Sequence, residues 1–348
     1  MWAPDRKYHA HTVFPKEEVM FARRSVSIVA VAAAAALLAG CAGGPAGTEP
    51  EPGGEERVKI TVATQPDFFG VPLYFAVQKG FLEAEGLDAE LQEFPTGVEG
   101  TEAVATGLAD FTTVAGFPVA SLAAKGAAVR IIGHNANSYQ WWGFVTDGSI
   151  SKPEDLYGKT VGLQSNSTAE YWFNRFVEFH NLDASQIKVL DAKYAQLVPA
   201  FAQSEVDAII HFEPNVFKAV DSRPGSKVAW WGGDDNLLPF YGYVAAGPKI
   251  YKNEKVGKAV LRGLAAASAY MKSNQAEVIE FIRNLTGVTE ESEIRKILSQ
   301  IDFSVAFDAV SVEQIQIIAD YQLERGNISS PVKAEDIVIT DWVGTMAK

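Results

Sequence analysis

The sequence predicts an α/β protein of two lobes, each a mixed, mostly parallel sheet flanked by helices. Short apolar runs typical of strands alternate with helical segments, and this alternation requires crossover connections between parallel strands. The alternation starts again near Lys159, which indicates a second lobe. Two further extended segments, Trp142–Thr146 and Tyr241–Ala246, are flanked by glycines. We expect these two segments to cross between the lobes and to form a hinge.

The first series of elements runs from Val58 to Gly133. The run Val58–Ala63 alternates as a half-buried strand does. Pro72 near a first turn and Gly80 after a last turn delimit the first helix. By the same signals we expect further strands at Asp88–Phe94, Asp110–Val114 and Val129–Gly133, and helices at Pro72–Lys79, Thr101–Thr106 and Pro118–Lys125.

The second series repeats this order, and a helical section follows it. We expect strands at Lys159–Leu163, Ile187–Leu190, Asp207–Phe212 and Lys227–Trp231, and helices at Thr168–Leu182, Val198–Gln203 and Asn215–Val220. The segments AVATGLADFTTVAGFP and PAFAQSEVDAIIHFEP share one order of helix, turn, Asp, strand and Pro, with Asp110 and Asp207 in matching places. Helices are expected at Glu254–Lys272, Ala276–Asn284, Glu290–Gln300 and Val312–Glu324. We assign residues 58–146 and 242–348 to lobe 1, and residues 147–241 to lobe 2.

The N-terminal part of the chain is typical of an export signal. Arg23 and Arg24 precede an apolar run, Val26–Leu38, that is shorter than the roughly 20 residues needed to span a bilayer. The run ends in Leu-Ala-Gly-Cys41, which resembles a bacterial lipobox and makes Cys41 a lipidation site; the alternative is an ordinary signal peptide with an incidental cysteine. We assign residues 1–40 to the signal peptide, with 1–19 an over-extended start, and residues 41–57 to a flexible tether rich in Gly, Pro and Glu.

Composition excludes several classes of function. The formal net charge of −13 argues against broad electrostatic binding to nucleic acid or anionic lipid. A single cysteine excludes a disulfide framework, a thiolate zinc site and an iron–sulfur cluster. The sequence contains no Gly-x-Ser-x-Gly elbow, HExxH or phosphate-binding loop. We therefore expect a protein that is not an enzyme and that holds no cofactor and no metal.

Two motifs carry a family resemblance. Lys-Gly-Phe-Leu-Glu-Ala-Glu-Gly-Leu at Lys79–Leu87 and Asp-Leu-Tyr-Gly-Lys-Thr-Val-Gly at Asp155–Gly162 resemble signatures of the periplasmic-binding-protein type 2 fold. The resemblance is to the nitrate/sulfonate/taurine and thiamine-pyrimidine class of ABC-transporter solute receptors. It implies a monomeric, lipid-anchored receptor on the extracytoplasmic face that closes two lobes on a small solute and delivers it to ABC permease subunits. The same superfamily includes a pyrimidine synthase with a cysteine-rich motif, which this chain lacks beyond Cys41.

The resemblance also implies that ligand contacts lie in the loops after equivalent strands. The candidate ligand-binding residues are Gln65, Asp67, Phe68, Phe69, Thr96, Gly97, Gly116, Tyr139, Trp142, Ser165, Asn166, Ser167, Thr168, Tyr194, His211 and Glu213. Gly97, Gly100 and the hydroxyls of residues 165–168 suit an anion at a helix start, unless they only cap the helices. Aromatic side chains with Asp67 and Glu213 suit an amine or a nitrogen heterocycle, unless they are core rings and solvated charges.

The predicted function is an extracytoplasmic solute-binding lipoprotein for a small sulfonate, taurine-like or nitrogen-containing solute. A zwitterion such as an aminosulfonate would satisfy both the helix starts and the carboxylates. The alternatives are a receptor for a thiamine-precursor pyrimidine or another heterocycle or amine, and a lipoprotein that presents its ligand to a membrane sensor.

Overall fold

The computed structural model describes residues 57–234 and 239–346. The predicted signal peptide, the tether up to residue 56 and the lipidation site Cys41 lie outside the described residues. In the part of the chain that is described, no helix is long and apolar enough to cross a membrane.

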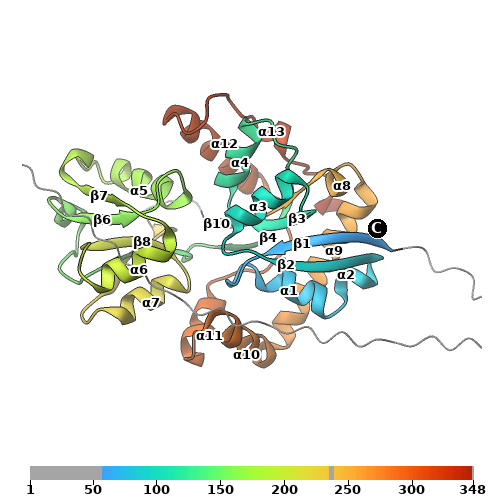
Figure 1. The fold of residues 1–348 in the computed structure, drawn as a ribbon, viewed down its shortest axis with the longest axis horizontal. Helices are drawn as coiled ribbons and strands as arrows, with labels where there is room; N and C mark the ends of the chain where they lie inside the picture. Colours follow the sequence, from blue (N-terminus) through green and yellow to red (C-terminus); the bar gives the residue numbers. More distant parts are fainter. Residues whose placement is uncertain (1–56, 235–238, 347–348) are drawn as a thin grey trace, which may run out of the picture. The chain divides into compact units, whose positions relative to one another are not determined.

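Lobe 1 is built on a five-stranded sheet of order β2-β1-β3-β10-β4 (Figure 1). β1 pairs in parallel with β2 and β3, whereas β10 is antiparallel to both β3 and β4. The four residues of β3 are all buried, as expected for an interior strand covered on both faces. The strands are β1 (Val58–Thr64), β2 (Leu87–Glu93), β3 (Phe111–Val114), β4 (Arg130–Ser138) and β10 (Phe240–Ala246).

Lobe 2 repeats this plan with the order β7-β6-β8-β5-β9. β6 is parallel to β7 and β8, and β5 is antiparallel to β8 and β9. The strands are β5 (Trp142–Thr146), β6 (Thr160–Leu163), β7 (Lys188–Asp191), β8 (Ala208–Phe212) and β9 (Lys227–Trp231).

The internal repeat predicted from the sequence is confirmed by one pair of equivalent contacts. In lobe 1 the carboxylate of Asp110 accepts the Thr61 backbone N–H at 2.8 Å. In lobe 2 the carboxylate of Asp207 accepts the Thr160 backbone N–H at the same distance. Each aspartate also donates its own backbone N–H to the carbonyl of the same threonine. Asp110 therefore links the start of β3 to β1 in lobe 1, and Asp207 links the start of β8 to the equivalent strand β6 in lobe 2.

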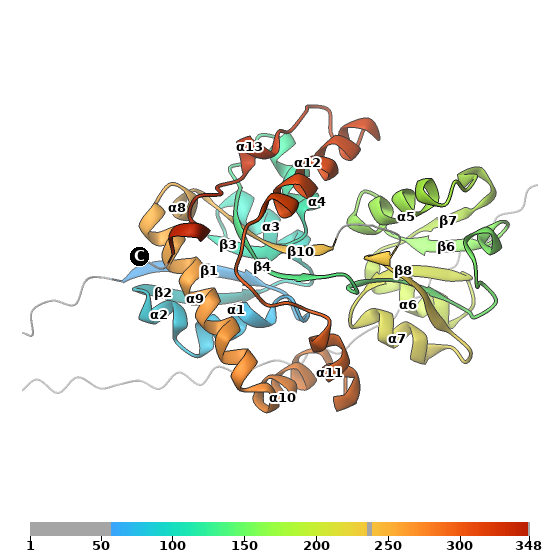
Figure 2. The same cartoon turned by 180° about the vertical axis from the view of Figure 1, so that it is seen from behind.

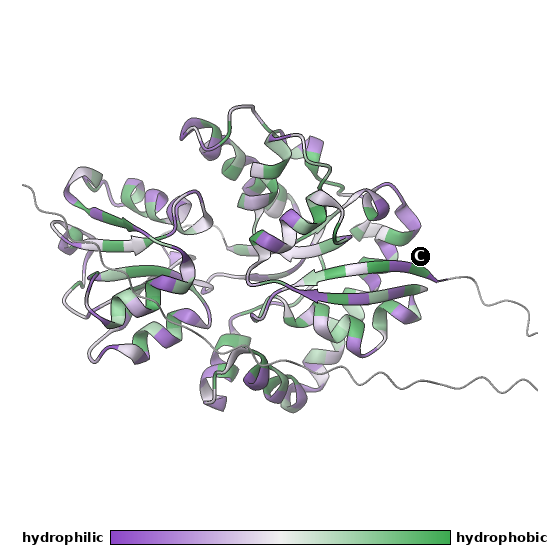
Figure 3. Cartoon of the chain, viewed as in Figure 1, coloured by the Kyte–Doolittle hydropathy of each residue, from purple (hydrophilic) through white to green (hydrophobic). Residues whose placement is uncertain are grey.

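Helices cover both sheets. In lobe 1, α1 packs against α9 and α4 packs against α12 (Figure 2). Figure 3 shows hydrophilic and hydrophobic residues alternating along the helices, as amphipathic covering helices require. The helices of lobe 1 are α1 (Val71–Gln78), α2 (Phe81–Ala84), α3 (Gly97–Thr106), α4 (Gly116–Ala124), α8 (Pro248–Tyr251), α9 (Glu254–Ser273), α10 (Gln275–Thr286), α11 (Glu291–Ser299), α12 (Ala309–Glu324) and α13 (Ala334–Ile337). Those of lobe 2 are α5 (Thr168–Phe179), α6 (Tyr194–Ala202) and α7 (Asn215–Ser222).

The predicted hinge strands are wrong, and the lobe boundaries move with them. Trp142–Thr146 is β5, an interior strand of the lobe 2 sheet, and Tyr241–Ala246 belongs to β10 in the lobe 1 sheet. The chain instead passes from the lobe 1 sheet to the lobe 2 sheet between Ser138 and Trp142, and the lobe 1 sheet resumes at Phe240. Both misassigned segments are extended and almost fully buried, and hydrophobic pattern alone does not distinguish such a segment from a sheet strand.

Other boundaries shift by less. α3 begins at Gly97, four residues before the predicted Thr101, because Thr96 supplies its cap. β4 continues to Ser138 instead of ending at Gly133, paired with β10 for most of its length. The short helix α2 is not predicted from the sequence.

Candidate ligand-binding site

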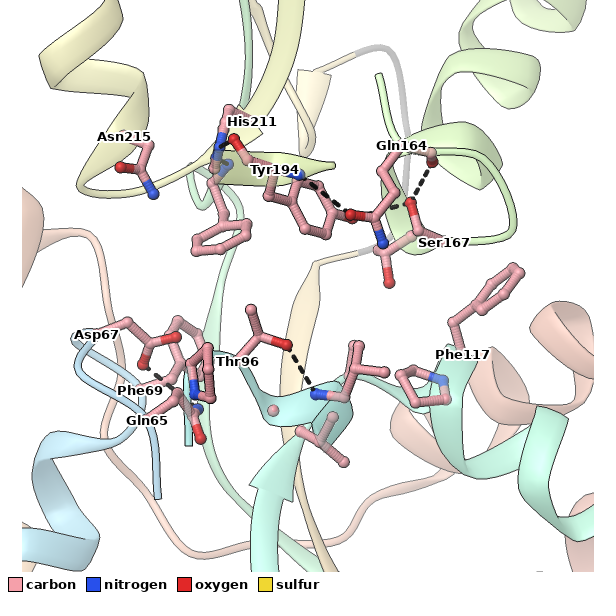
Figure 4. Close-up of a pocket in the computed structure, with 18 of the residues that line it drawn as sticks. Gln65, Asp67, Phe69, Thr96, Phe117, Gln164, Ser167, Tyr194, His211 and Asn215 are labelled. Atoms are coloured by element: carbon pink, nitrogen blue, oxygen red, sulfur yellow. Dashed lines mark hydrogen bonds between the residues drawn. The ribbon is translucent and has the colours of Figure 1, made fainter. Parts of the chain in front are cut away.

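A cavity of about 670 Å³ is lined by residues from both lobes (Figure 4). Its lobe 1 wall comes from the loop after β1 and from the starts of α3 and α4, with Gln65, Thr96 and Phe117 among the lining residues. Its lobe 2 wall comes from the loop after β6 and from the starts of α5, α6 and α7. The cavity therefore lies at the carboxyl ends of parallel strands, where ligands of open α/β sheets bind.

Most of the sequence-predicted site residues line this cavity. They are Gln65, Asp67, Phe69, Thr96, Gly97, Trp142, Asn166, Ser167, Thr168, Tyr194 and His211. The others do not line it: Phe68, Gly116, Tyr139, Ser165 and Glu213.

Two of the excluded residues are core residues. Phe68 is fully buried, with its ring edge-to-face to Trp141 at 6.4 Å between centroids. Glu213 is 4% exposed and its carboxylate accepts the Phe217 N–H at the start of α7. Burial raises the pKa of Glu213 to about 7, against a lowering by this hydrogen bond. Its sequence neighbours face the cavity in its place.

The other three excluded residues lie outside the cavity lining. Tyr139 is 56% exposed in the segment that joins the two sheets. Gly116 packs under the ring of Tyr243, because a Cβ there would lie 3.2 Å from its Cε2. The backbone N–H of Ser165 donates to the Asp191 carboxylate at 2.8 Å.

At α5 the predicted polar helix start is a cap. Ser167 Oγ accepts the Ala169 N–H at 3.1 Å and donates to the Gln164 carbonyl at 2.6 Å. The Tyr194 hydroxyl donates to the same Oγ at 2.8 Å. The backbone N–H of Asn166 is a donor that could otherwise bind an anion. In this structure it donates to the Glu170 carboxylate at 2.6 Å. The capping alternative therefore holds at this helix.

At α3 the same alternative holds. Thr96 Oγ1 accepts the Val98 N–H at 3.1 Å and also contacts the Glu99 carboxylate. A Cβ on Gly97 would meet the Val114 side chain at 3.0 Å, and one on Gly100 would meet Thr112 Oγ1 at 3.0 Å. These glycines let α3 pack closely on β3, and ligand approach at Gly97, which lines the cavity, stays a prediction.

An aromatic group forms the apolar part of the lining. The ring of Phe69 lies 4.4 Å from Trp141 and 4.9 Å from Phe240 between centroids. Trp142 lies 5.3 Å from Phe212, edge to face. Trp142, Phe212 and Phe240 belong to strands of the two sheets. Trp141 lies in a segment that joins the sheets, and Phe69 lies in the loop after β1. Such a surface suits the apolar body of an organic solute.

His211 offers no ring nitrogen to a ligand. Its Nε2 lies 3.1 Å from the Tyr194 carbonyl oxygen, and its Nδ1 accepts the Phe212 N–H at 2.9 Å. Nε2 therefore carries the proton, because a carbonyl oxygen can only accept. Burial lowers the pKa of His211 to about 4, so the ring is neutral at physiological pH.

Asp67 and Gln65 form a polar corner of the lobe 1 wall (Figure 4). The Asp67 carboxylate accepts the Gly70 N–H at 2.8 Å and the Gln65 Nε2–H at 3.4 Å. Desolvation nevertheless raises the pKa of Asp67 to about 7. Gln65 Nε2 also donates to the Thr113 carbonyl at 3.3 Å. Its buried Oε1 has no hydrogen-bond partner among residues 57–234 and 239–346.

Sequence reasoning missed several lining residues. Gln164, Asn215 and Lys218 line the lobe 2 wall, and Thr286 and Asn327 reach the cavity from the C-terminal helical section. Asn215 and Lys218 are three residues apart at the start of α7, and this spacing on one helix face is the signal that could have identified them. Thr286 is the last residue of α10 and Asn327 follows α12, both far from the predicted loops, and the sequence carries no comparable signal for them.

Among the residues that the structure describes, no cluster of three or more His, Cys, Asp or Glu side chains could hold a metal ion. The lining supplies hydrogen bonds, aromatic faces and charge to a bound solute.

The sequence model of the family described as NMT1/THI5 like matches residues 66–285, which span both walls of the cavity. The chain belongs to the NMT1/THI5-like family. This NMT1/THI5-like protein is also 21% identical over 161 residues to the taurine-binding periplasmic protein of Escherichia coli, covering 46% of this chain and 50% of that protein.

Solved structures of binding proteins share the fold of this family member. The periplasmic aliphatic sulphonate binding protein SsuA of Escherichia coli matches with a TM-score of 0.72 and 22% identity, over 81% of this chain and 92% of that chain. The alkanesulfonate-binding protein SsuA of Xanthomonas axonopodis, bound to MOPS, matches with a TM-score of 0.70 and 20% identity, over 82% and 100%. The predicted two-lobed periplasmic-binding-protein fold is confirmed.

The fold also occurs in an enzyme. The desulfurization enzyme DszB matches the NMT1/THI5-like protein with a TM-score of 0.63 and 14% identity, over 84% of this chain and 99% of that chain. The SsuA structures are more similar on both measures. At these identities the comparisons show a shared fold.

Proposed function

We propose that this protein is an extracytoplasmic receptor that binds a small organosulfonate between its two lobes. The observation that carries the proposal is the cavity of about 670 Å³ shared by both lobes, which is of the size used for small organic ligands. Its apolar rings suit the carbon body of the solute, and Lys218 and Asn215 supply donors for the acid group. Relatives that are named for sulfonate and taurine binding support this ligand class.

A site shared by both lobes also supports delivery of the bound solute to a membrane transporter. A solute that contacts both lobes favours the closed arrangement, and an ABC permease that recognises this arrangement receives the solute. The Leu-Ala-Gly-Cys41 motif supports anchoring of the protein to the membrane by lipid on Cys41. Monomeric state and the permease partnership are part of the same proposal.

A nitrogen heterocycle is the second candidate. It is favoured by the aromatic group together with the polar corner of Asp67 and Gln65, because ring stacking and hydrogen bonds to an amino group would use both. Within the nitrogen heterocycles we favour thiamine-precursor pyrimidines, because the family resemblance of the sequence includes receptors for them.

A thermal-shift screen of the purified protein tests the proposal. The panel contains taurine, longer alkylsulfonates, nitrate, aminopyrimidines, thiamine and choline-type amines. A ligand at about 100 times its dissociation constant adds roughly 2.7 kcal/mol to the free energy of unfolding. For a chain of this size, that raises the melting temperature by several degrees. Stabilisation by sulfonates is the expected result. Stabilisation by pyrimidines alone would transfer the proposal to the second candidate, and no stabilisation by any sulfonate or pyrimidine would overturn it.

A further inference from the structure

Two half-buried charges of opposite sign line the cavity, one on each wall. Asp67 follows β1 in lobe 1, and Lys218 lies on α7 in lobe 2. Both side chains are partly buried, whereas the other two charged lining residues, Glu102 and Lys125, are exposed to solvent. Asp67 and Asn215, which begins the same helix as Lys218, lie on facing walls at one end of the cavity (Figure 4).

Neither charge has a counter-ion within 4.0 Å in the described part of the chain. The Asp67 carboxylate accepts the Gly70 backbone N–H and the Gln65 side-chain N–H. The Lys218 ammonium donates to a neutral carbonyl oxygen, that of Thr286, at 3.0 Å. Desolvation raises the pKa of Asp67, against a lowering by its hydrogen bonds, and desolvation lowers the pKa of Lys218. A partly buried charge without a partner is costly, and a ligand of opposite charge would relieve that cost.

We propose that the cavity selects a zwitterionic solute, with its ammonium group on Asp67, its acid group on Lys218 and its carbon body against the aromatic rings. This inference deepens the proposed function, because it names the kind of sulfonate that the site takes. Gln65 supports the placement of the ammonium group. Its amide nitrogen donates to two acceptors, so its buried oxygen points elsewhere and can accept a hydrogen bond from the ammonium group.

The same arrangement disfavours solutes with a single charge. A plain alkylsulfonate would leave the Asp67 carboxylate without a partner and close to a second negative charge. A plain amine would leave Lys218 uncompensated beside a second positive charge. Each mismatch leaves a partly buried charge unpaired, which is how binding sites reject the wrong ligand.

Three probes with one carbon body test the inference by isothermal titration calorimetry at pH 8, where the Asp67 carboxylate is ionised. They are N-cyclohexyl-2-aminoethanesulfonate, which is a zwitterion, 2-cyclohexylethanesulfonate, which is only an anion, and N-ethylcyclohexylamine, which is only a cation. The zwitterion is expected to bind about tenfold or more tightly than either single-charge probe, because each charge-assisted hydrogen bond contributes on the order of 1.5–3 kcal/mol.

Charge variants assign the two ends. Asp67→Asn keeps an oxygen for the Gly70 N–H, and it should bring the affinity for the zwitterion down to that for the anion. Lys218→Met should bring it down to that for the cation. Exposed charges outside the cavity lining give matched controls, and Glu205→Gln and Lys188→Met should each change the affinity less than about twofold. Circular dichroism verifies that each variant is folded.

The outcomes separate this inference from the proposed function. Binding of the anion as tightly as the zwitterion would overturn the zwitterion inference and leave the sulfonate function standing. A zwitterion preference that survives both Asp67→Asn and Lys218→Met would overturn the assignment to these residues. Failure of all three probes, while an alkylsulfonate without an amino group binds in the thermal-shift panel, would overturn the inference alone. Failure of every sulfonate would overturn the proposed function.

Discussion

The hydroxyl of Tyr194 donates to Ser167 Oγ at 2.8 Å and joins the starts of α6 and α5 at the cavity wall. Ser167 Oγ thereby uses its proton and its acceptor capacity within the protein, since it also donates to Gln164 and accepts from Ala169. The serine shapes the wall and has no hydrogen left to donate to a solute. This contact explains why a residue that lines the cavity can still act mainly in stability.

Replacing this serine should therefore affect stability more than affinity. Ser167→Ala removes the cap of α5 and is expected to lower the free energy of unfolding by about 1 kcal/mol, measured by urea denaturation. Ligand affinity should change less than about threefold. Ser165→Ala is the matched control, because Ser165 does not line the cavity, and it should leave both quantities near the original. A loss of affinity above tenfold in Ser167→Ala would mean that the hydroxyl contacts the solute.

Trp142 is expected to contribute directly to binding. Its indole Nε1 is buried and has no hydrogen-bond partner in the described part of the protein, and its ring lines the cavity. Trp142→Phe keeps an aromatic ring but removes this donor and part of the apolar face, and it should weaken binding about three- to tenfold. Tyr139→Ala, at an exposed neighbour outside the cavity, should have no effect. Equal affinities of the Trp142→Phe variant and the original protein, by calorimetry, would remove Trp142 from the site.

Stability should fall with rising pH through the buried Glu213. Burial raises the pKa of this carboxyl from 4.5 to about 7, so the folded protein binds a proton that the unfolded chain releases. The resulting stability is fully present below about pH 4.5 and is lost as the pH rises through about 7. The difference is at most about 3 kcal/mol. Glu213→Gln keeps an acceptor for the Phe217 N–H and should lose less stability than the original protein between pH 5 and pH 8.

Urea denaturation at the two pH values measures this difference. Asp67, whose pKa is also raised, and His211, whose pKa is lowered, contribute to both proteins alike, so the comparison isolates Glu213. The same pH dependence in both proteins would show that Glu213 ionises normally in the folded state.

Gly242 is expected to be essential for the shape of the cavity. A Cβ at this position would lie 2.5 Å from Phe69 Cδ1 and 3.0 Å from Thr113 Cγ2. Gly242→Ala must displace the Phe69 ring, and it should cost about 1–3 kcal/mol of stability and weaken ligand binding. Gly344→Ala, with no neighbour within 4 Å of its Cβ, should be neutral in both thermal denaturation and calorimetry. Unaltered ligand affinity in Gly242→Ala would show that Phe69 does not shape the binding surface.

The repeat of the fold could be predicted from local pattern, whereas strand partners could not. Asp110 and Asp207 stand in matching sequence contexts because each fastens the same pair of strands. Trp142–Thr146 has an extended, apolar pattern that fits both a crossing segment and an interior strand, and only its pairing with β8 and β9 distinguishes them. The predicted lobe boundary is therefore wrong by one strand, Trp142–Thr146, at the first crossing, and only by Phe240 and Tyr241 at the second.

The residues of the candidate site likewise include some that local sequence pattern predicts and some that it does not. Gln65, Asp67 and Phe69 follow a strong strand and precede a helix, so a strand-end rule located them in the cavity wall. Lys218 lies on a helix and Asn327 follows one, and both reach the cavity only through tertiary packing. The hydroxyls of Thr96 and Ser167 were correctly placed at the cavity, but a sequence cannot show whether a capping oxygen keeps any hydrogen bond for a ligand.

A crystal structure of the protein with the tightest-binding solute of the panel tests the central claim most directly. The account predicts the solute between the two lobes, with its carbon body on Phe69 and Trp141 and its acid group toward Lys218. A saturating ligand that occupies any other surface, with this cavity empty, would contradict it.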